Sequence, residues 1–231
     1  MSLRRRGAGL LAVALLVVTG CGGGESEESG PDLLARAKTT LDDASSAHFI
    51  LNSEGAPEQG TLLVGGDGDI ARPASFDGTL KVRALGSTLD LAVVSVDGTV
   101  YAQLPFTSTY SGVDPAQFGF GDPGARIDPD TGISQLLAKA ESVELGEESR
   151  VDGEVVREVS AELPGDLVEQ ILTSADPDTP VQARFSIAVD SGELRRAVLT
   201  GPFYTADEDA TFTLQLSDFG ADVEITAPPT G

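Results

Sequence analysis

Short segments in which apolar and polar residues alternate make up most of the chain. The alternation is clearest in 181–189, where every second residue from Val181 onward is apolar, and again in 210–216. A period of two is typical of strands with one face toward a core and one toward solvent. Between two such segments, Asp97-Gly98 is a strong hairpin signal. The pattern predicts antiparallel strands at 61–64, 76–85, 88–96, 99–104, 157–163, 181–189, 193–201, 210–219 and 222–226.

Three other segments have the spacing of amphipathic helices. The longest is 31–47, whose single apolar stripe consists of Leu33, Leu34, Ala37, Leu41 and Ala44. Shorter helices are predicted at 128–142 and 164–175. An apolar stripe needs a surface to cover, and the dry face of the strands supplies one. The predicted fold class is α+β: a long, curved antiparallel sheet with helices packed on its concave face, in a single domain over 31–231.

The first 20 residues have the order of a secretory signal peptide. A basic start at 4–6 precedes an uncharged run from Leu10 to Val18, which is too short to span a bilayer as a helix. The stretch "VTGC" that follows resembles the lipobox of bacterial lipoproteins, although Val18 stands where that box usually has Leu. The resemblance implies cleavage before Cys21 and a diacylglyceryl group on its sulfur. An incidental cysteine in a cleaved signal is the alternative.

The residues after the signal are strongly acidic. Cleavage after residue 20 removes three of the 15 basic residues and none of the 37 acidic ones, which takes the net charge from −22 to −25. Such a chain repels nucleic acid, so nucleic-acid binding is excluded, and the acidity otherwise serves solubility. Cys21 is the only cysteine, so no disulfide forms within the chain. The acidic, glycine-rich residues 21–30 are predicted to be the lipidated cysteine and a flexible linker.

The sequence contains no complete catalytic or metal-binding pattern. His48 is the only histidine, and no G-x-S-x-G nucleophile motif is present. The stretch "GFGDPG" (119–124) matches a nucleotide-binding pattern by letter but follows no predicted strand, which favours a flexible loop. The stretch "DPDTG" (128–132) begins like a calcium-binding loop, but the third acidic position and the closing Glu of such a loop are absent. The sequence therefore predicts no enzyme, no cofactor and no metal site.

Several segments, in order, resemble the LppX/LprG-type lipoproteins of mycobacteria and related actinobacteria. They are the lipobox at 18–21, "AHFIL" (47–51), "GTLKV" and "LDLAVVSVDGTVYAQL" within 78–104, "DPAQ" (114–117), "DPDTGISQLLA" (128–138) and "DVEITAPP" (222–229). The resemblance implies a half-barrel sheet whose helices enclose an apolar cavity for acylated lipids or glycolipids. It also implies anchoring to the outer face of the cytoplasmic membrane and carriage of lipids through the cell envelope without catalysis. A membrane transporter is the further partner that the resemblance implies.

Strand alternation selects the residues expected to line this cavity. Lys81 and Arg83 should face solvent, so their neighbours face the concave side. The same reasoning on the other strands gives the full expected lining: Leu80, Val82, Ala84, Leu89, Leu91, Val93, Phe185, Ile187, Phe212 and Leu214. With no Trp and 5% aromatic residues, small side chains could leave the space hollow. A packed core is the alternative on composition alone.

Two further expectations concern the cavity mouth. Phe118 and Phe120, in 118–127, are predicted to form an apolar lid, with a disordered insertion as the equal alternative. The relatives are associated with anionic glycolipids, whereas a net charge of −25 argues against a broadly basic headgroup site and makes neutral acylglycerols at least as plausible. The rival function is a tethered adaptor or sensor with a filled core that binds a protein.

Overall fold

The computed structural model describes residues 28–105 and 107–231. The predicted signal peptide, Cys21 and most of the linker lie outside these residues. The described chain forms one antiparallel sheet of 11 strands in the order β6-β5-β4-β3-β2-β1-β11-β10-β9-β8-β7. The strands are β1 (Ser46–Glu54), β2 (Leu62–Ala71), β3 (Ser75–Ala84), β4 (Ser87–Val96), β5 (Thr99–Gln103), β6 (Ser111–Gly112), β7 (Glu141–Val151), β8 (Glu154–Leu163), β9 (Val181–Ala188), β10 (Leu194–Thr205) and β11 (Glu208–Ser217).

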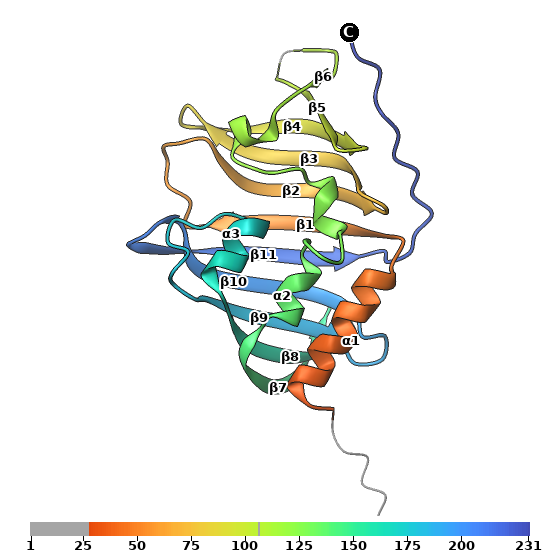
Figure 1. Ribbon diagram of the computed structural model, residues 1–231, viewed down its shortest axis with the longest axis vertical. Helices are drawn as coiled ribbons and strands as arrows, with labels where there is room; N and C mark the ends of the chain where they lie inside the picture. The colour runs from red at the N-terminus through yellow and green to blue at the C-terminus, as the bar shows by residue number, and fades with distance from the viewer. Residues whose placement is uncertain (1–27, 106) are drawn as a thin grey trace, which may run out of the picture.

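The pairing of β1 with β11 joins the first half of the chain to the last. Consecutive strands pair within each half. The two halves meet at the centre of the sheet, where Leu51 of β1 lies opposite Leu214 of β11. Figure 1 shows the result as one tall sheet with the helices in front of it. The predicted antiparallel sheet with helices on one face is therefore confirmed, and β1, which was not predicted as a strand, is its central element.

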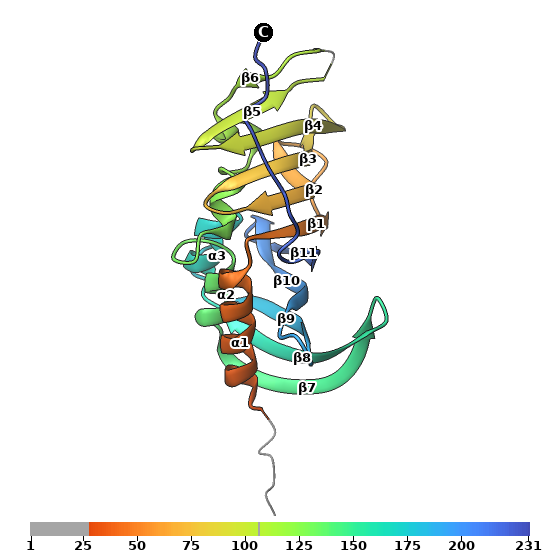
Figure 2. The same cartoon turned by 90° about the vertical axis from the view of Figure 1, so that its right-hand side faces the viewer.

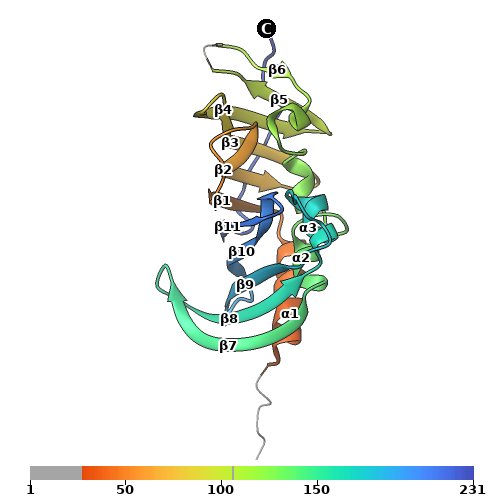
Figure 3. The ribbon, with the colours of Figure 1, turned by 90° about the vertical axis from the view of Figure 1, so that its left-hand side faces the viewer.

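Short helical elements cover one face of the sheet. They are α1 (Gly30–Asp43), the 3-10 helices η1 (Pro115–Phe118) and η2 (Gly124–Ile127), α2 (Ser134–Ala138) and α3 (Gly165–Ile171). Figure 2 shows them together on one side, while the hairpin of β7 and β8 bends toward the opposite side. Figure 3 shows the same division from the other edge. None of the helices in the described residues is long and apolar enough to cross a membrane.

The first helix begins within one residue of its predicted start but ends at Asp43, four residues before its predicted end at 47. The side chain of Ser29 accepts a hydrogen bond from the amide of Asp32, and Pro31 occupies the first turn, as is common at helix starts. The predicted stripe is buried against the sheet, except that the helix ends one residue before Ala44. The guanidinium of Arg72 donates to the carbonyl of Leu41 at 3.2 Å and to that of Ala44 at 2.9 Å, which satisfies the end of the helix.

Several predicted boundaries were wrong. The helix expected at 128–142 shrinks to α2, because the carboxylate of Asp128 accepts from the amides of Asp130 and Thr131 and holds a turn there. The strand β7, rich in Glu, was not predicted. The segment 222–226 is no strand; the chain after β11 runs along the sheet (Figure 1), where Thr230 bridges to Tyr110.

The strand β2 is longer than its predicted core at 61–64, because its glycines are part of the sheet and not of a turn. Gly68 pairs directly with Gly78 on β3. A Cβ at either glycine would collide with the ring of Phe76, which is fully buried. The glycine pair therefore leaves the space that this ring occupies.

Candidate functional site

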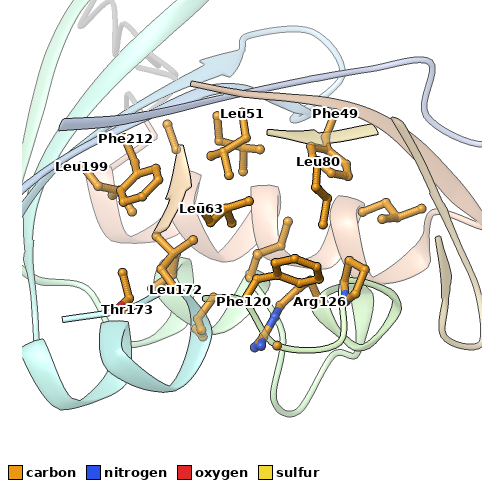
Figure 4. Close-up of a pocket in the computed structure, with 18 of the residues that line it drawn as sticks. Phe49, Leu51, Leu63, Leu80, Phe120, Arg126, Leu172, Thr173, Leu199 and Phe212 are labelled. Carbon is orange, nitrogen blue, oxygen red and sulfur yellow. The ribbon is translucent and has the colours of Figure 1, made fainter. Parts of the chain in front are cut away.

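An apolar pocket lies between the sheet and its helical cover, with a cavity volume of about 110 Å³. The sheet contributes Phe49, Leu51, Leu63, Ile70, Leu80, Ala197, Leu199, Phe212 and Leu214. The cover contributes Gly119, Phe120, Gly121, Pro123, Arg126, Ile133, Leu136, Ile171, Leu172 and Thr173. Figure 4 shows these side chains pointing toward one another from the two layers.

Strand alternation places the sheet side of the pocket at the centre of the sheet. Phe49 and Leu51 on β1 pair with Leu216 and Leu214 on β11, so both strands present apolar side chains to the same face. The side chain of Phe212, on β11, packs edge-on against Phe203 with ring centroids 4.9 Å apart. The two strands that join the halves of the sheet therefore form the centre of the pocket floor, and β2, β3 and β10 complete it.

Part of the pocket's cover comes from the loop between η1 and η2. Phe120 is 8% exposed and lines the pocket, and its ring stacks on Phe118 with centroids 6.2 Å apart. The two phenylalanines predicted as a lid thus lie together, and of the two only Phe120 lines the pocket. Gly119 lies so close to the carbonyl of Thr61, just before β2, that a side chain at this position would collide with it.

Of the expected lining residues, the structure brings Leu80, Phe212 and Leu214 to the pocket. Val82, Leu91 and Val93 belong to the same buried cluster around β3 and β4 as Leu80, Phe120 and Ile127, but they do not line the pocket. Phe185 and Ile187 are buried in the cluster beneath α1. Ala84 and Leu89 are half-buried near the strand ends.

The sequence analysis missed most of the remaining lining. Phe49 and Leu51 alternate within "AHFIL", so their period-two spacing was an available signal. Residues from the cover, such as Ile133, Ile171 and Leu172, carried no such signal. Their place in the pocket depends on how the short helices lie on the sheet.

Two polar side chains, those of Arg126 and Thr173, lie at the edge of the pocket (Figure 4). Arg126, from η2, is half-buried, and its Nη1 donates to the carbonyl of Gln170 in α3 at 3.0 Å. Burial lowers the pKa of Arg126, although nearby Asp122 opposes this effect. Thr173 places a second hydrogen-bonding side chain at the lining. The pocket is thus apolar inside and has a guanidinium at its edge (Figure 4).

A second hollow, of about 400 Å³, lies beneath the hairpin of β7 and β8 and is polar. Its arginine, Arg195, is neutralised by Glu154 and Glu193, each 2.6 Å away. Its histidine, His48, lies 2.8 Å from Asp69 through Nδ1. No group of three or more His, Cys, Asp or Glu side chains within the described part of the chain could hold a metal ion.

Comparison with known proteins identifies the family to which this chain belongs. Residues 30–225 match the family described as LppX_LprAFG lipoprotein. The chain belongs to this lipoprotein family. The resemblance seen in the sequence is therefore confirmed, and the family match covers the whole sheet together with its helical cover.

Individual members of the LppX_LprAFG family agree with this assignment. The lipoarabinomannan carrier protein LprG of Mycobacterium tuberculosis strain H37Rv is 29% identical over 228 residues, covering 95% of this chain and 92% of the relative. The crystal structure of LprF from Mycobacterium bovis has a TM-score of 0.73 at 19% identity, covering 87% of this chain and 97% of that one. LppX from Mycobacterium tuberculosis has a TM-score of 0.64 at 16% identity, covering 85% and 99%. The two structures share the fold.

Proposed function

We propose that this lipoprotein is anchored through Cys21 to the outer face of the cytoplasmic membrane, binds acylated lipids or glycolipids in its apolar pocket, and transfers them across the cell envelope. The observation that carries the proposal is the pocket between the sheet and its cover, lined almost entirely by aliphatic and aromatic side chains. The similarity to a protein named as a lipoarabinomannan carrier supports the same class of ligand.

The energetics of acyl chains fit a carrier. Burying a chain of about fifteen methylene groups at ~0.8 kcal/mol each gives roughly 12 kcal/mol before the cost of association. A bilayer offers the same chain a similar environment, so transfer between membrane and pocket is nearly balanced. Release into water is very slow. Such a carrier needs a dry pocket with an opening and no catalytic residue.

The cover of the pocket is suited to admitting a chain. Its elements η1, η2, α2 and α3 are only four to seven residues long and are not strands of the sheet. Short helices derive their stability mainly from packing, so their displacement disrupts few backbone hydrogen bonds. The strands of the floor are paired on both sides. Opening of the pocket therefore takes place in the cover, while the floor stays fixed.

Native mass spectrometry of the chain carrying Cys21→Ala tests the proposal, because that change keeps the protein's own acyl chains out of the pocket. We expect co-purified lipid in this protein. Leu80→Trp should place a ring in the pocket and reduce bound lipid with little change in thermal midpoint.

Leu91→Trp is the matched control, since Leu91 pairs directly with Leu80 across β3 and β4 and shares its buried cluster but does not line the pocket. Its enlargement should overpack the cluster and cost about 1–3 kcal/mol of stability. Absence of lipid from the Cys21→Ala protein, with equal destabilisation by both tryptophans, would contradict the carrier and favour an adaptor with a filled core.

A further inference from the structure

The turn between β3 and β4 presents Leu85 to solvent with a side chain that is 101% exposed, the highest value for a large apolar residue in the described part of the chain. A single exposed leucine is common on soluble proteins. This one is unusual because its backbone φ is 52°, in the left-handed region that costs a leucine free energy and that turns usually give to Asn, Asp or Gly. Neither the backbone nor water favours leucine here, so its presence points to a contact outside the chain.

Residues 81–87, here called the β3–β4 tip, lack the negative charge that dominates the rest of the chain. Within 78–96 there is one carboxylate, that of Asp90, which lies opposite Lys81 in the strand register. The tip also carries Arg83, and the side chain of Lys81 is exposed. In a chain of net charge −22, the tip is therefore a small surface that is both apolar and cationic.

The other connections at this end of the sheet differ from one another in charge. The connection after β5 belongs to the uncharged segment 98–113, so it adds no charge beside the tip. By contrast, the connection between β1 and β2 carries Glu58, and the turn between β10 and β11 carries Asp207 and Glu208. An anionic surface that approaches this end is therefore repelled at the turn between β10 and β11 and accepted at the tip.

Arg83 ties the tip to the connection before β2, which in turn contacts the cover of the pocket. Its Nη1 donates to the carbonyls of Ala56 at 2.8 Å and of Pro57 at 3.1 Å. Leu62, at the start of β2, lies opposite Arg83 in the register, and a Cβ on Gly119 would lie 3.3 Å from the Cα of Leu62. Because Gly119 belongs to the loop between η1 and η2, the tip adjoins the cover.

We propose that the β3–β4 tip is the surface with which this carrier docks onto a bilayer that contains anionic lipids. The side chain of Leu85 enters the acyl region, while Lys81 and Arg83 lie among the headgroups, where a negative surface potential attracts basic residues. This inference rests on the proposed function, because docking beside the cover brings the bilayer to the part of the pocket wall that is suited to open.

The position of the first helix leaves the tip free for this contact. α1 begins at the opposite edge of the sheet, where a Cβ on Gly30 would lie 2.9 Å from the side chain of Val143 on β7. Figure 1 shows this edge at the bottom of the molecule and the strands β3 and β4 near the top. Among the described residues, the start of the helix that follows the proposed anchor therefore does not cover the tip.

Vesicle binding by the Cys21→Ala protein tests the tip without the proposed anchor. The vesicles contain phosphatidylcholine alone, or phosphatidylcholine and phosphatidylglycerol in equal parts. We expect the protein to co-sediment with the mixed vesicles, less with phosphatidylcholine alone, and less at high salt. Leu85→Asn should weaken binding to the mixed vesicles about tenfold, because the inserted leucine is lost, while the thermal midpoint does not fall. Lys81→Gln should weaken binding to the mixed vesicles only.

Leu145→Asn is the matched control. The side chain of Leu145, on β7 at the opposite edge of the sheet, is 39% exposed, so the change removes an exposed leucine from a surface without basic neighbours on either side in the chain. Vesicle binding should be unchanged in this variant.

Tryptophan fluorescence shows which leucine meets the bilayer, because the chain contains no Trp of its own. The emission of Leu85→Trp should shift to the blue when mixed vesicles are added and should be quenched by lipids with brominated acyl chains. The emission of Leu145→Trp should not change.

The outcomes separate docking from carriage. Constant emission of Leu85→Trp with both kinds of vesicle, or an equal shift in Leu145→Trp, would overturn the tip as the docking surface. A blue shift without vesicles that grows with protein concentration would show that a second copy of the chain covers Leu85, and would overturn the bilayer as its partner. Native mass spectrometry of the same samples tests carriage: co-purified lipid without vesicle contact would overturn docking alone, whereas vesicle contact without co-purified lipid would overturn the carrier.

Discussion

The hydroxyl of Tyr204 donates a hydrogen bond to the backbone carbonyl of Leu63 at 2.8 Å. Tyr204 is on β10 and Leu63 on β2, two strands that β11 and β1 separate in the sheet. Both residues lie where the strand register shifts, between Gly201 and Thr205 on β10 and between Leu63 and Gly65 on β2. One side chain therefore ties the two halves of the sheet together at the edge of the pocket.

Removing this hydrogen bond should destabilise the fold without emptying the pocket. In Tyr204→Phe the ring keeps its contact with Phe212, whose centroid is 5.7 Å away, but the carbonyl of Leu63 loses its donor and Ser53 loses a partner. We expect a loss of about 1–2 kcal/mol in the free energy of unfolding, measured by urea denaturation. Ser53→Ala, which removes only the second of these bonds, should cost less. An unchanged unfolding midpoint in Tyr204→Phe would contradict this role.

The same residue should make stability sensitive to alkaline pH. Burial raises the pKa of Tyr204, although the hydrogen bond with Ser53 and the charge of Arg83 partly oppose this. Folding therefore favours the protonated phenol, and its contribution is complete below the unfolded pKa of about 10 and is lost as the pH rises through the folded value. Thermal midpoints measured from pH 8 upward should fall above pH 10, and less steeply in Tyr204→Phe. The remaining slope includes Tyr110, whose pKa burial also raises.

The alternation of side chains predicted the faces of the strands but not which part of the face is hollow. Leu80 and Leu91 are direct neighbours with the same pattern and belong to the same buried cluster, yet only Leu80 lines the pocket. That difference depends on where Phe120 and Ile127 come to lie, which is a matter of tertiary packing. Arg126 was missed for the same reason, because its loop has no periodicity and the net charge pointed away from a cationic site.

The exposed Leu85 gives a test of backbone strain. Leu85-Gly86 joins β3 to β4 in the same two-residue turn that Asp97-Gly98 forms between β4 and β5, with first-residue φ values of 52° and 51°. Asp tolerates this left-handed conformation, whereas Leu adopts it at a cost in free energy. The side chain of Leu85 is 101% exposed, so no burial offsets that cost. Leu85→Asn should therefore stabilise the protein by about 0.5–1 kcal/mol. Asp97→Leu in the matching turn should destabilise it by a similar amount, and a destabilised Leu85→Asn would show that Leu85 makes a contact in solution.

The proposed anchor at Cys21 is tested by measuring how the protein divides between the membrane fraction and the soluble or secreted fraction of the cell. Cys21 lies outside the described residues and precedes α1, the first element of the domain, so Cys21→Ala should leave the thermal midpoint unchanged. Stable attachment takes two or more acyl chains, which the lipidated cysteine would supply, so the variant should move from the membrane fraction to the secreted or soluble fraction. Ser26→Ala, a change in the same linker, should stay in the membrane fraction. If Cys21→Ala still partitions into the detergent phase as the unchanged protein does, the cysteine is not the anchor.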